Sequence, residues 1–252
     1  MSGISFSDVT KIFKTESGDT VNAIENINFT VDKGEFVSLL GPSGSGKSTI
    51  LRIAIGLLEP TSGDVYLDKN RVDSPPDNAG MVFQEYSLMP WLSVLDNIVF
   101  GLELKGVPKE ERYEKGKKIM KNFGLEGFEE SFPYELSGGM QQRAAIARTI
   151  AYSPEFLFMD EPFGALDAFT RIKMQKDLIK LYLEEKSTVL FVTHSVEEAV
   201  FLSKRIIILS PRPGKIHKIY ENNMDYPRDR YSQEFQNLTK EIMDEMISLD
   251  VL

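Results

Sequence analysis

The 252-residue chain contains no cysteine, one tryptophan and two histidines. Without cysteine it cannot form disulfides, use a thiol nucleophile or bind metal through thiolates, a composition compatible with the cytosol. It also lacks any apolar run near the roughly 18–20 residues that cross a bilayer. Its first residues lack the basic-then-apolar layout of a secretory signal.

Basic residues are fewer than acidic ones, 29 against 38, which gives a net charge of −9. We therefore expect no general nucleic-acid-binding surface and no nucleic-acid partner. Apolar residues make up 42% of the chain and charged residues 27%, which is typical of a globular protein with a sizeable core. The length allows one large α/β domain, or one such domain with an inserted subdomain.

A phosphate-binding pattern lies between a predicted strand and a predicted helix. Residues 35–40, EFVSLL, resemble a buried strand, and residues 48–58 a helix. Between them, residues 41–48 read GPSGSGKS and fit the pattern G-x-x-x-x-G-K-[ST]. Glycines allow backbone N–H groups to surround a phosphate, Lys47 supplies positive charge, and the hydroxyl of Ser48 suits Mg²⁺. This stretch therefore predicts a nucleoside triphosphate site.

Strand and helix patterns divide the chain into two parts. Strands are predicted near residues 4–13, 23–31, 64–67, 81–83, 156–161, 188–193, 205–210 and 215–220. Helices are predicted over residues 94–104, 108–123, 144–152 and 232–248. We expect one domain over 1–252, in which residues 1–85 and 153–252 form the nucleotide-binding core. Residues 86–152 are expected to form an inserted helical subdomain.

Two acidic residues end the apolar strand that begins at Phe156. Ligands bind at the carboxyl ends of parallel strands, so Asp160 and Glu161 should face the phosphate loop. Asp160 suits a contact to Mg²⁺, and Glu161 can polarise an attacking water; the alternative is that both acids cap the next turn. His194 follows another buried strand and is placed to touch a γ-phosphate, although a lone histidine is more often structural.

Three further features have both a structural and a functional interpretation. Ser137, Gly138 and Gly139 precede a helix and form either a second anion site or an ordinary N-cap. Phe13 ends the first strand and either stacks on adenine or belongs to the core. Gln84 ends the strand near residue 83 and contacts the nucleotide only if the wider pattern places it there.

These motifs, taken in order, resemble the ATP-binding subunit of an ABC transporter over nearly the whole chain. The matches are the phosphate loop GPSGSGKST, Gln84 as the Q-loop glutamine, LSGGMQQR as the signature, FLFMDE as the Walker B strand, ALD at 165–167 as the D-loop and His194 as the switch histidine. The implied fold is an α/β P-loop NTPase core with an antiparallel β-subdomain and an inserted helical subdomain.

The resemblance implies that ATP and Mg²⁺ are the bound cofactors. It implies catalytic roles for Glu161, His194 and Gln84 and metal contacts from Ser48, Gln84 and Asp160. The nucleotide contacts it implies are Phe13, Gly41, Pro42, Ser43, Gly44, Ser45, Gly46, Lys47, Ser48, Thr49, Ser137, Gly138, Gly139, Gln141 and Asp167. It further implies a head-to-tail pair of copies, in which Ser137 and Gly139 of one copy meet the γ-phosphate held by the other.

Finer features are similar to the importer subunits of the nitrate, sulfonate and taurine group, namely DEPFGALDAFTR, FQEYSLMPWLSVLDNI and ILSPRPGKI. Such a subunit is peripheral on the cytoplasmic face of the membrane, works with an integral membrane permease, and serves a solute-binding protein indirectly. The uncharged stretch Tyr86–Leu92 is either a buried connector or the groove that receives the permease. Nitrate, taurine, alkane sulfonates, bicarbonate and thiamine precursors remain open as cargo.

Two other classes share part of this pattern. A GTPase would use the phosphate loop, but DNAG at 77–80 precedes a strand where its D-x-x-G element should follow one, and no [NT]-K-x-D element is present. A non-transport ABC ATPase would act as an ATP-driven clamp on nucleic acid. The acidic balance argues against that alternative, as does the spacing of only about ninety residues between phosphate loop and signature.

Overall fold

The computed structural model describes residues 3–16 and 18–250. The chain forms two compact units. Unit 1 comprises Met1–Ala79, Phe156–Asp160 and Lys186–Leu252, and unit 2 comprises Gly80–Glu155 and Glu161–Glu185. The predicted helical insertion, residues 86–152, falls within unit 2, which also includes the segment that follows Asp160.

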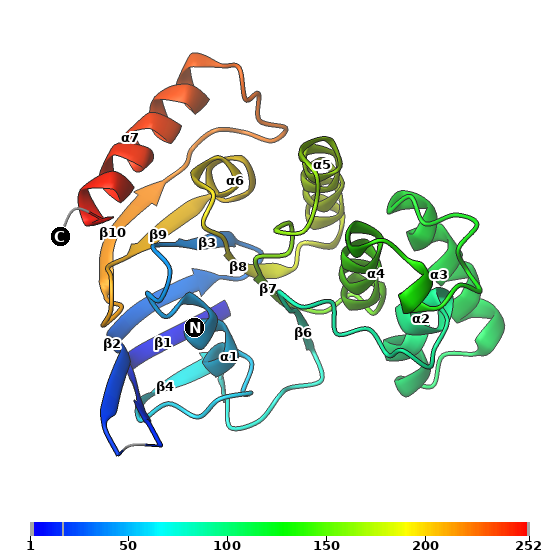
Figure 1. Ribbon diagram of the computed structural model, residues 1–252, viewed down its shortest axis with the longest axis horizontal. Coiled ribbons are helices and arrows are strands. Elements are labelled where there is room, and N and C mark those ends of the chain that lie inside the picture. The colour runs from blue at the N-terminus through cyan, green and yellow to red at the C-terminus, as the bar shows by residue number, and fades with distance from the viewer. Residues whose placement is uncertain (1–2, 17, 251–252) are drawn as a thin grey trace. The chain divides into compact units, whose positions relative to one another are not determined.

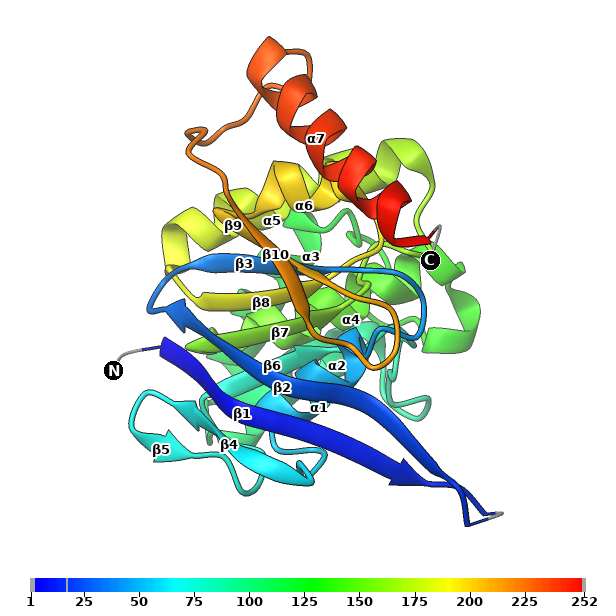
Figure 2. The same cartoon turned by 90° about the vertical axis from the view of Figure 1, so that its left-hand side faces the viewer.

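The first sheet of unit 1 is antiparallel and has the strand order β2-β1-β4-β5. Its long hairpin is visible in Figure 2. Alternating burial along β1 and β2 matches the alternating sequence pattern, and the rings of Phe6 and Phe29 stack with centroids 4.4 Å apart. The strands are β1 (Gly3–Lys14), β2 (Thr20–Asp32), β4 (Ser62–Leu67) and β5 (Asn70–Arg71).

The second sheet has the order β10-β9-β3-β8-β7-β6, and of β6 only Ala79 belongs to unit 1. Strands β9, β3, β8 and β7 run parallel, and β10 is antiparallel to β9. Every residue of β3, β7 and β8 is buried, as continuous apolar runs in parallel strands require. The strands are β3 (Phe36–Leu40), β6 (Ala79–Val82), β7 (Phe156–Asp160), β8 (Thr188–Val192), β9 (Arg205–Leu209) and β10 (Ile216–Glu221).

The helices of unit 1 are α1 (Lys47–Ala54), α6 (Val196–Leu202) and α7 (Gln233–Asp250). The sequence predicts a helix as far as residue 58, and this prediction was wrong at the C-terminal end, because α1 ends at Ala54. Gly56 adopts a left-handed φ of 77°, and the N–H groups of Leu57 and Leu58 both donate to the carbonyl of Arg52. This glycine-centred C-cap replaces the last helical turn.

Unit 2 is mainly helical and contains α2 (Val94–Leu104), α3 (Lys109–Asn122), η1 (Pro133–Glu135), α4 (Gly138–Ala151) and α5 (Ala168–Glu185). The predicted helices over 94–104 and after Pro108 are confirmed. Ser93 caps α2 by accepting a bond from the N–H of Asp96. Helices α2 and α3 pack closely at Gly116, where a Cβ atom would lie 2.5 Å from a methyl group of Val99. Within the described residues, no helix is long and apolar enough to cross a membrane.

Candidate active site

The phosphate loop of unit 1 joins β3 to α1 and depends on glycine at two positions. Gly44 and Gly46 adopt left-handed φ angles of 78° and 86°. Gly46 is the N-cap of α1, and a Cβ there would lie 2.3 Å from a methyl group of Ile24. The backbone N–H groups at this helix start have the orientation and partial positive charge that bind phosphate.

Lys47 lies inside its own loop and is only 7% exposed. Its ammonium group donates to the carbonyls of Gly41 and Pro42 at 2.8 and 2.9 Å and approaches the hydroxyl of Ser45 at 3.5 Å. These bonds hold a positive charge at the loop, where it can neutralise a phosphate.

The hydroxyl of Ser48 donates to a carboxylate oxygen of Asp160 at 2.9 Å. The sequence predicts these two residues as Mg²⁺ contacts, although 112 positions separate them along the chain. A hydroxyl beside a carboxylate is a donor set that fits Mg²⁺, which uses few protein ligands and keeps phosphate and water oxygens. In the part of the chain that the structure describes, no cluster of three or more His, Cys, Asp or Glu forms a metal site.

Three adjacent parallel strands bring these groups to one edge of the sheet (Figure 1). The phosphate loop follows β3, Asp160 ends β7, and His194 comes two residues after β8. His194 is exposed, whereas its neighbour Thr193 is buried and donates to Glu198 at 2.6 Å. That buried bond fixes the turn that presents the histidine.

Phe13 is 38% exposed, so the core alternative for this ring is wrong. It lies in β1 opposite Val21, and the ammonium of Lys11 is 5.3 Å from its ring centroid. An exposed aromatic face beside a cation is suited to stacking on a base.

Glu161 is the first residue of unit 2 after Asp160, and it is partly exposed. Its φ of 45° is uncommon for a residue with a side chain. Its carbonyl accepts a bond from the N–H of Gly164 at 3.1 Å, which closes the turn. Such backbone strain clusters at functional sites.

The signature residues form the start of α4 in unit 2. Ser137 is the N-cap, and its hydroxyl accepts from the N–H of Met140 at 3.4 Å. The side chain of Gln141 donates to the carbonyls of Pro133 and Leu136 and so fixes the segment before the helix. A Cβ at Gly138 would lie 2.8 Å from the hydroxyl of Tyr86.

Asp167 caps the N-terminus of α5, accepting from the N–H groups of Phe169 and Thr170 at 3.1 Å each. The hydroxyl and N–H of Thr170 hold the pKa of this carboxyl below its usual value. The aspartate is therefore a fixed negative charge on an exposed turn.

Gln84 is exposed, and it precedes the segment Tyr86–Leu92. All seven residues of this segment are at least partly exposed, and Trp91 is 72% exposed. The buried-connector alternative is therefore wrong.

Asn97 fixes this segment, a role that the sequence analysis missed. It is fully buried in α2, where its side chain accepts from the N–H of Met89 at 2.8 Å. It donates to the carbonyls of Met89, Leu92 and Ser93 at 3.0–3.1 Å. The sequence could have indicated this role, because Asn97 is a polar residue beside Ile98 in an otherwise apolar helix face.

We expect Asn97→Leu to destabilise the protein by about 2–4 kcal/mol, because it leaves several buried backbone groups without partners. Urea unfolding measures this change. The matched control is Asn70→Leu at an exposed position of β5, which should stay within about 0.5 kcal/mol of the parent. Equal stability of the two variants would contradict the role given to Asn97.

Comparisons with known proteins agree with this geometry. Residues 24–164 match the family model described as "ABC transporter". An uncharacterized ABC transporter ATP-binding protein of Methanocaldococcus jannaschii is 55% identical over 94% of this chain and 88% of its own length. The aliphatic sulfonates import ATP-binding protein of Bacillus thuringiensis is 46% identical over 95% of this chain and 94% of its own length.

Among solved structures, a dimeric post-hydrolysis state of an ATP-binding cassette bound to ADP and Pi superimposes with a TM-score of 0.80. It is 36% identical, and the match covers 88% of this chain and 100% of that one. A taurine import ATP-binding protein of Roseobacter denitrificans is 46% identical over 87% of this chain and 82% of its own length. A nitrate import ATP-binding protein of Synechocystis is 46% identical over 90% of this chain and 84% of its own length.

The fold and these matches define a P-loop ATPase of the cassette type. The chain belongs to the ABC transporter family and is an ATP-hydrolysing subunit of that family. The alternative of an ATP-driven clamp on nucleic acid draws no support from these relatives.

Proposed function

We propose that this chain powers the import of a small solute through a separate integral membrane permease. The observation that carries the proposal is the exposed segment Tyr86–Leu92, which Asn97 holds rigid and which follows Gln84. Relatives named for the import of sulfonates, taurine and nitrate support the class of cargo. Bicarbonate or a similar small solute is also compatible.

Within this proposal, ATP lies along the edge of unit 1 that carries the phosphate loop. The base stacks on Phe13, and the phosphates lie against the N–H groups of residues 41–49, with Lys47 near the β- and γ-phosphates. His194 contacts the γ-phosphate. Glu161 positions the attacking water and accepts its proton as the water oxygen bonds to the γ-phosphorus and the bond from that phosphorus to ADP breaks. Gln84 would be a ligand of Mg²⁺ when the cation is bound.

Ser48 and Asp160 are the residues that hold Mg²⁺ in this proposal, joined by Gln84. When bound, the cation neutralises charge on the phosphate oxygens. Ser48 and Asp160 both belong to unit 1, where the hydroxyl and the carboxylate lie 2.9 Å apart.

We further propose that two copies pair head to tail around ATP. Each chain carries two anion-binding helix starts, at the phosphate loop and at Ser137–Gly139, and one triphosphate can use both if they come from different copies. Gln141 and Asp167 support the signature and the turn at this interface. The dimeric state of the ATP-binding cassette structure, which holds ADP and Pi, supports the pairing.

Because both copies carry every motif, we expect a homodimer to be sufficient for hydrolysis. ATP turnover should then rise more than linearly with protein concentration at low concentration, since active sites form only on pairing. Measuring phosphate release over a dilution series tests this. A strictly linear dependence, with the protein shown to be monomeric by light scattering, would contradict the composite site.

Tyr86 provides a route from the nucleotide to the permease. Its hydroxyl lies against Gly138 of the signature, and Tyr86 begins the exposed segment. Loss of the γ-phosphate can shift the helical unit and with it the segment that the permease contacts. In this proposal the subunit works at the cytoplasmic face of the membrane, and the solute-binding protein acts through the permease.

We expect Trp91→Ala to leave folding and ATP hydrolysis nearly unchanged but to prevent stable assembly with the permease. The side chain is 72% exposed, so its removal costs little within the subunit, whereas exposed aromatic residues dominate partner interfaces. Leu104→Ala is the matched control, because Leu104 is 73% exposed in the same unit but lies outside the segment. Copurification from detergent-solubilised membranes measures assembly, and normal assembly of Trp91→Ala would contradict the proposed contact.

A further inference from the structure

The end of β9 and the turn that follows it, Ser210–Lys215, lie against the phosphate loop at three points. A Cβ at Gly41 would lie 3.0 Å from the carbonyl of Leu209, the last residue of β9. A Cβ at Gly214 would lie 1.9 Å from the carbonyl of Ser45. A Cβ at Gly44 would lie 3.3 Å from a guanidinium nitrogen of Arg212. Residues far apart in sequence thus bring an arginine to the rim of the phosphate loop.

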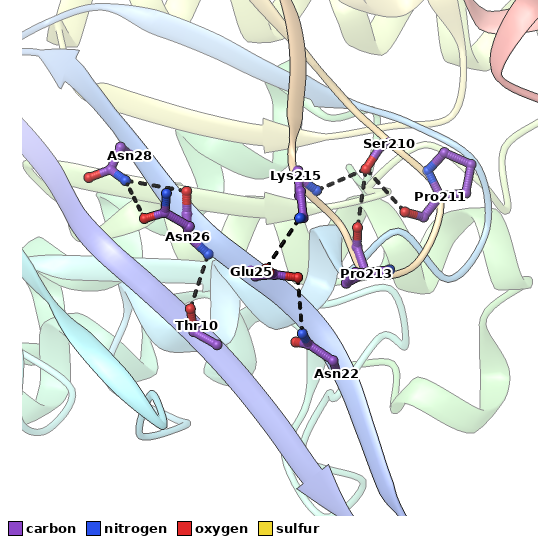
Figure 3. Close-up of polar contacts among 9 residues, drawn as sticks. All are labelled: Thr10, Asn22, Glu25, Asn26, Asn28, Ser210, Pro211, Pro213 and Lys215. Atoms are coloured by element: carbon purple, nitrogen blue, oxygen red, sulfur yellow. Dashed lines mark hydrogen bonds and ion pairs between the residues drawn. The ribbon is translucent and has the colours of Figure 1, made fainter.

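The turn is fixed to β2 by backbone and side-chain bonds. Gly214 donates to the carbonyl of Ala23 and accepts from the N–H of Glu25, both at 3.0 Å. Lys215 forms an ion pair with Glu25 at 3.2 Å (Figure 3). The neighbouring strand β1 carries Phe13, so the same local structure connects the turn with the expected adenine position.

The turn is also closed on itself (Figure 3). The hydroxyl of Ser210 lies 3.1 Å from the carbonyls of both Pro211 and Pro213 and accepts from the N–H of Lys215 at 3.0 Å. Prolines on both sides of Arg212 restrict the backbone, so ordering the turn for a ligand costs little entropy. Arg212 is therefore presented from a preorganised backbone.

Within the described residues, the guanidinium of Arg212 has no hydrogen-bond or ion-pair partner. Arg212 is exposed. Lys215, three residues further on, is paired with the carboxylate of Glu25, whereas the guanidinium of Arg212 lies beside Gly44 without such a carboxylate. In a chain of net charge −9, an unpaired arginine at an anion-binding loop favours an anionic ligand.

We propose that Arg212 is a nucleotide-binding residue that contacts a β- or γ-phosphate oxygen of ATP from the rim of the phosphate loop. This inference rests on the proposed triphosphate site. It adds a second cation to the one supplied by Lys47. A guanidinium forms two directed bonds to phosphate oxygens, so arginine is better suited here than lysine.

The test is calorimetric titration of Arg212→Gln, Arg212→Lys and the parent with ATP, ADP and AMP. We expect Arg212→Gln to raise the Kd for ATP about tenfold, as loss of a charge-assisted bond does. The effect should decrease from ATP to AMP and at high salt, and Arg212→Lys should recover part of the affinity. An unchanged Kd for ATP would overturn the proposal. An equal loss with all three nucleotides would also overturn it, because it would place the contact at the α-phosphate, the sugar or the base, which all three share.

Two control variants distinguish an error in the role of Arg212 from an error in the proposed triphosphate site. Arg71→Gln removes an exposed arginine paired with Asp64 elsewhere in unit 1 and should bind ATP like the parent. Lys47→Ala should lose most binding. If Lys47→Ala loses binding while Arg212→Gln does not, only the role of Arg212 is wrong. If the parent and Lys47→Ala bind ATP equally, the proposed triphosphate site is wrong. Equal thermal unfolding of Arg212→Gln and the parent excludes a folding defect.

Discussion

Replacing Glu161 with glutamine is expected to lower ATP turnover at least about a hundredfold while ATP binding persists. The substitution keeps the size of the side chain but removes the carboxylate that we propose orients the water and takes its proton, a role that typically contributes 10²- to 10⁴-fold. The unusual φ of 45° at this residue, directly after the buried Asp160, supports a role that depends on its position. Phosphate release and nucleotide titration on the same sample measure the two effects.

The same variant should accumulate as an ATP-bound dimer, because in the proposed pairing ATP binding closes the site between two copies and hydrolysis opens it again. Light scattering with ATP and Mg²⁺ measures the mass. Glu184→Gln is the control, since Glu184 is exposed near the end of α5 in the same unit. That variant should keep normal turnover and show no trapped dimer. A Glu161→Gln sample that stays monomeric under saturating ATP would count against head-to-tail pairing.

Lys47→Ala should weaken ATP binding about 10- to 100-fold and remove measurable hydrolysis. One charge-assisted contact to phosphate contributes about 1.5–3 kcal/mol, and the carbonyls of Gly41 and Pro42 also lose their donor. Calorimetric titration with ATP tests the first effect, and phosphate release the second.

Lys69→Ala removes an exposed lysine between β4 and β5 of the same unit and should behave like the parent. Comparing the two variants at equal salt separates a specific contact from general charge. Unchanged binding and turnover in Lys47→Ala would remove this residue from the phosphate site.

The parts predictable from the sequence are those that local rules specify. Continuous apolar runs predicted β3, β7 and β8, and Gly41, Gly46 and Lys47 have the spacing of a phosphate loop. Because parallel strands carry ligands at their carboxyl ends, Asp160 could be assigned to the site of Ser48 from 112 residues away. A general rule of sheet topology was therefore enough to predict this contact without a three-dimensional structure.

The parts that could not be predicted depend on long-range packing. Asn97 looks like one polar residue on a helix, and only its bonds to the segment at Met89 show why it is buried. Arg212 lies in a Pro-rich turn whose position against Gly44 depends on pairing with β2. The end of α1 was missed because the left-handed conformation of Gly56 outweighed a helical apolar pattern.

The most direct test of the central claim is the composition of the complex purified from solubilised membranes through a tag on this chain. Native mass spectrometry gives the stoichiometry of its components. The account predicts two copies of this chain bound to integral membrane subunits, with Leu104→Ala giving the same complex and Trp91→Ala giving the free chain. Recovery of the parent, Leu104→Ala and Trp91→Ala proteins alike without any membrane subunit would contradict it.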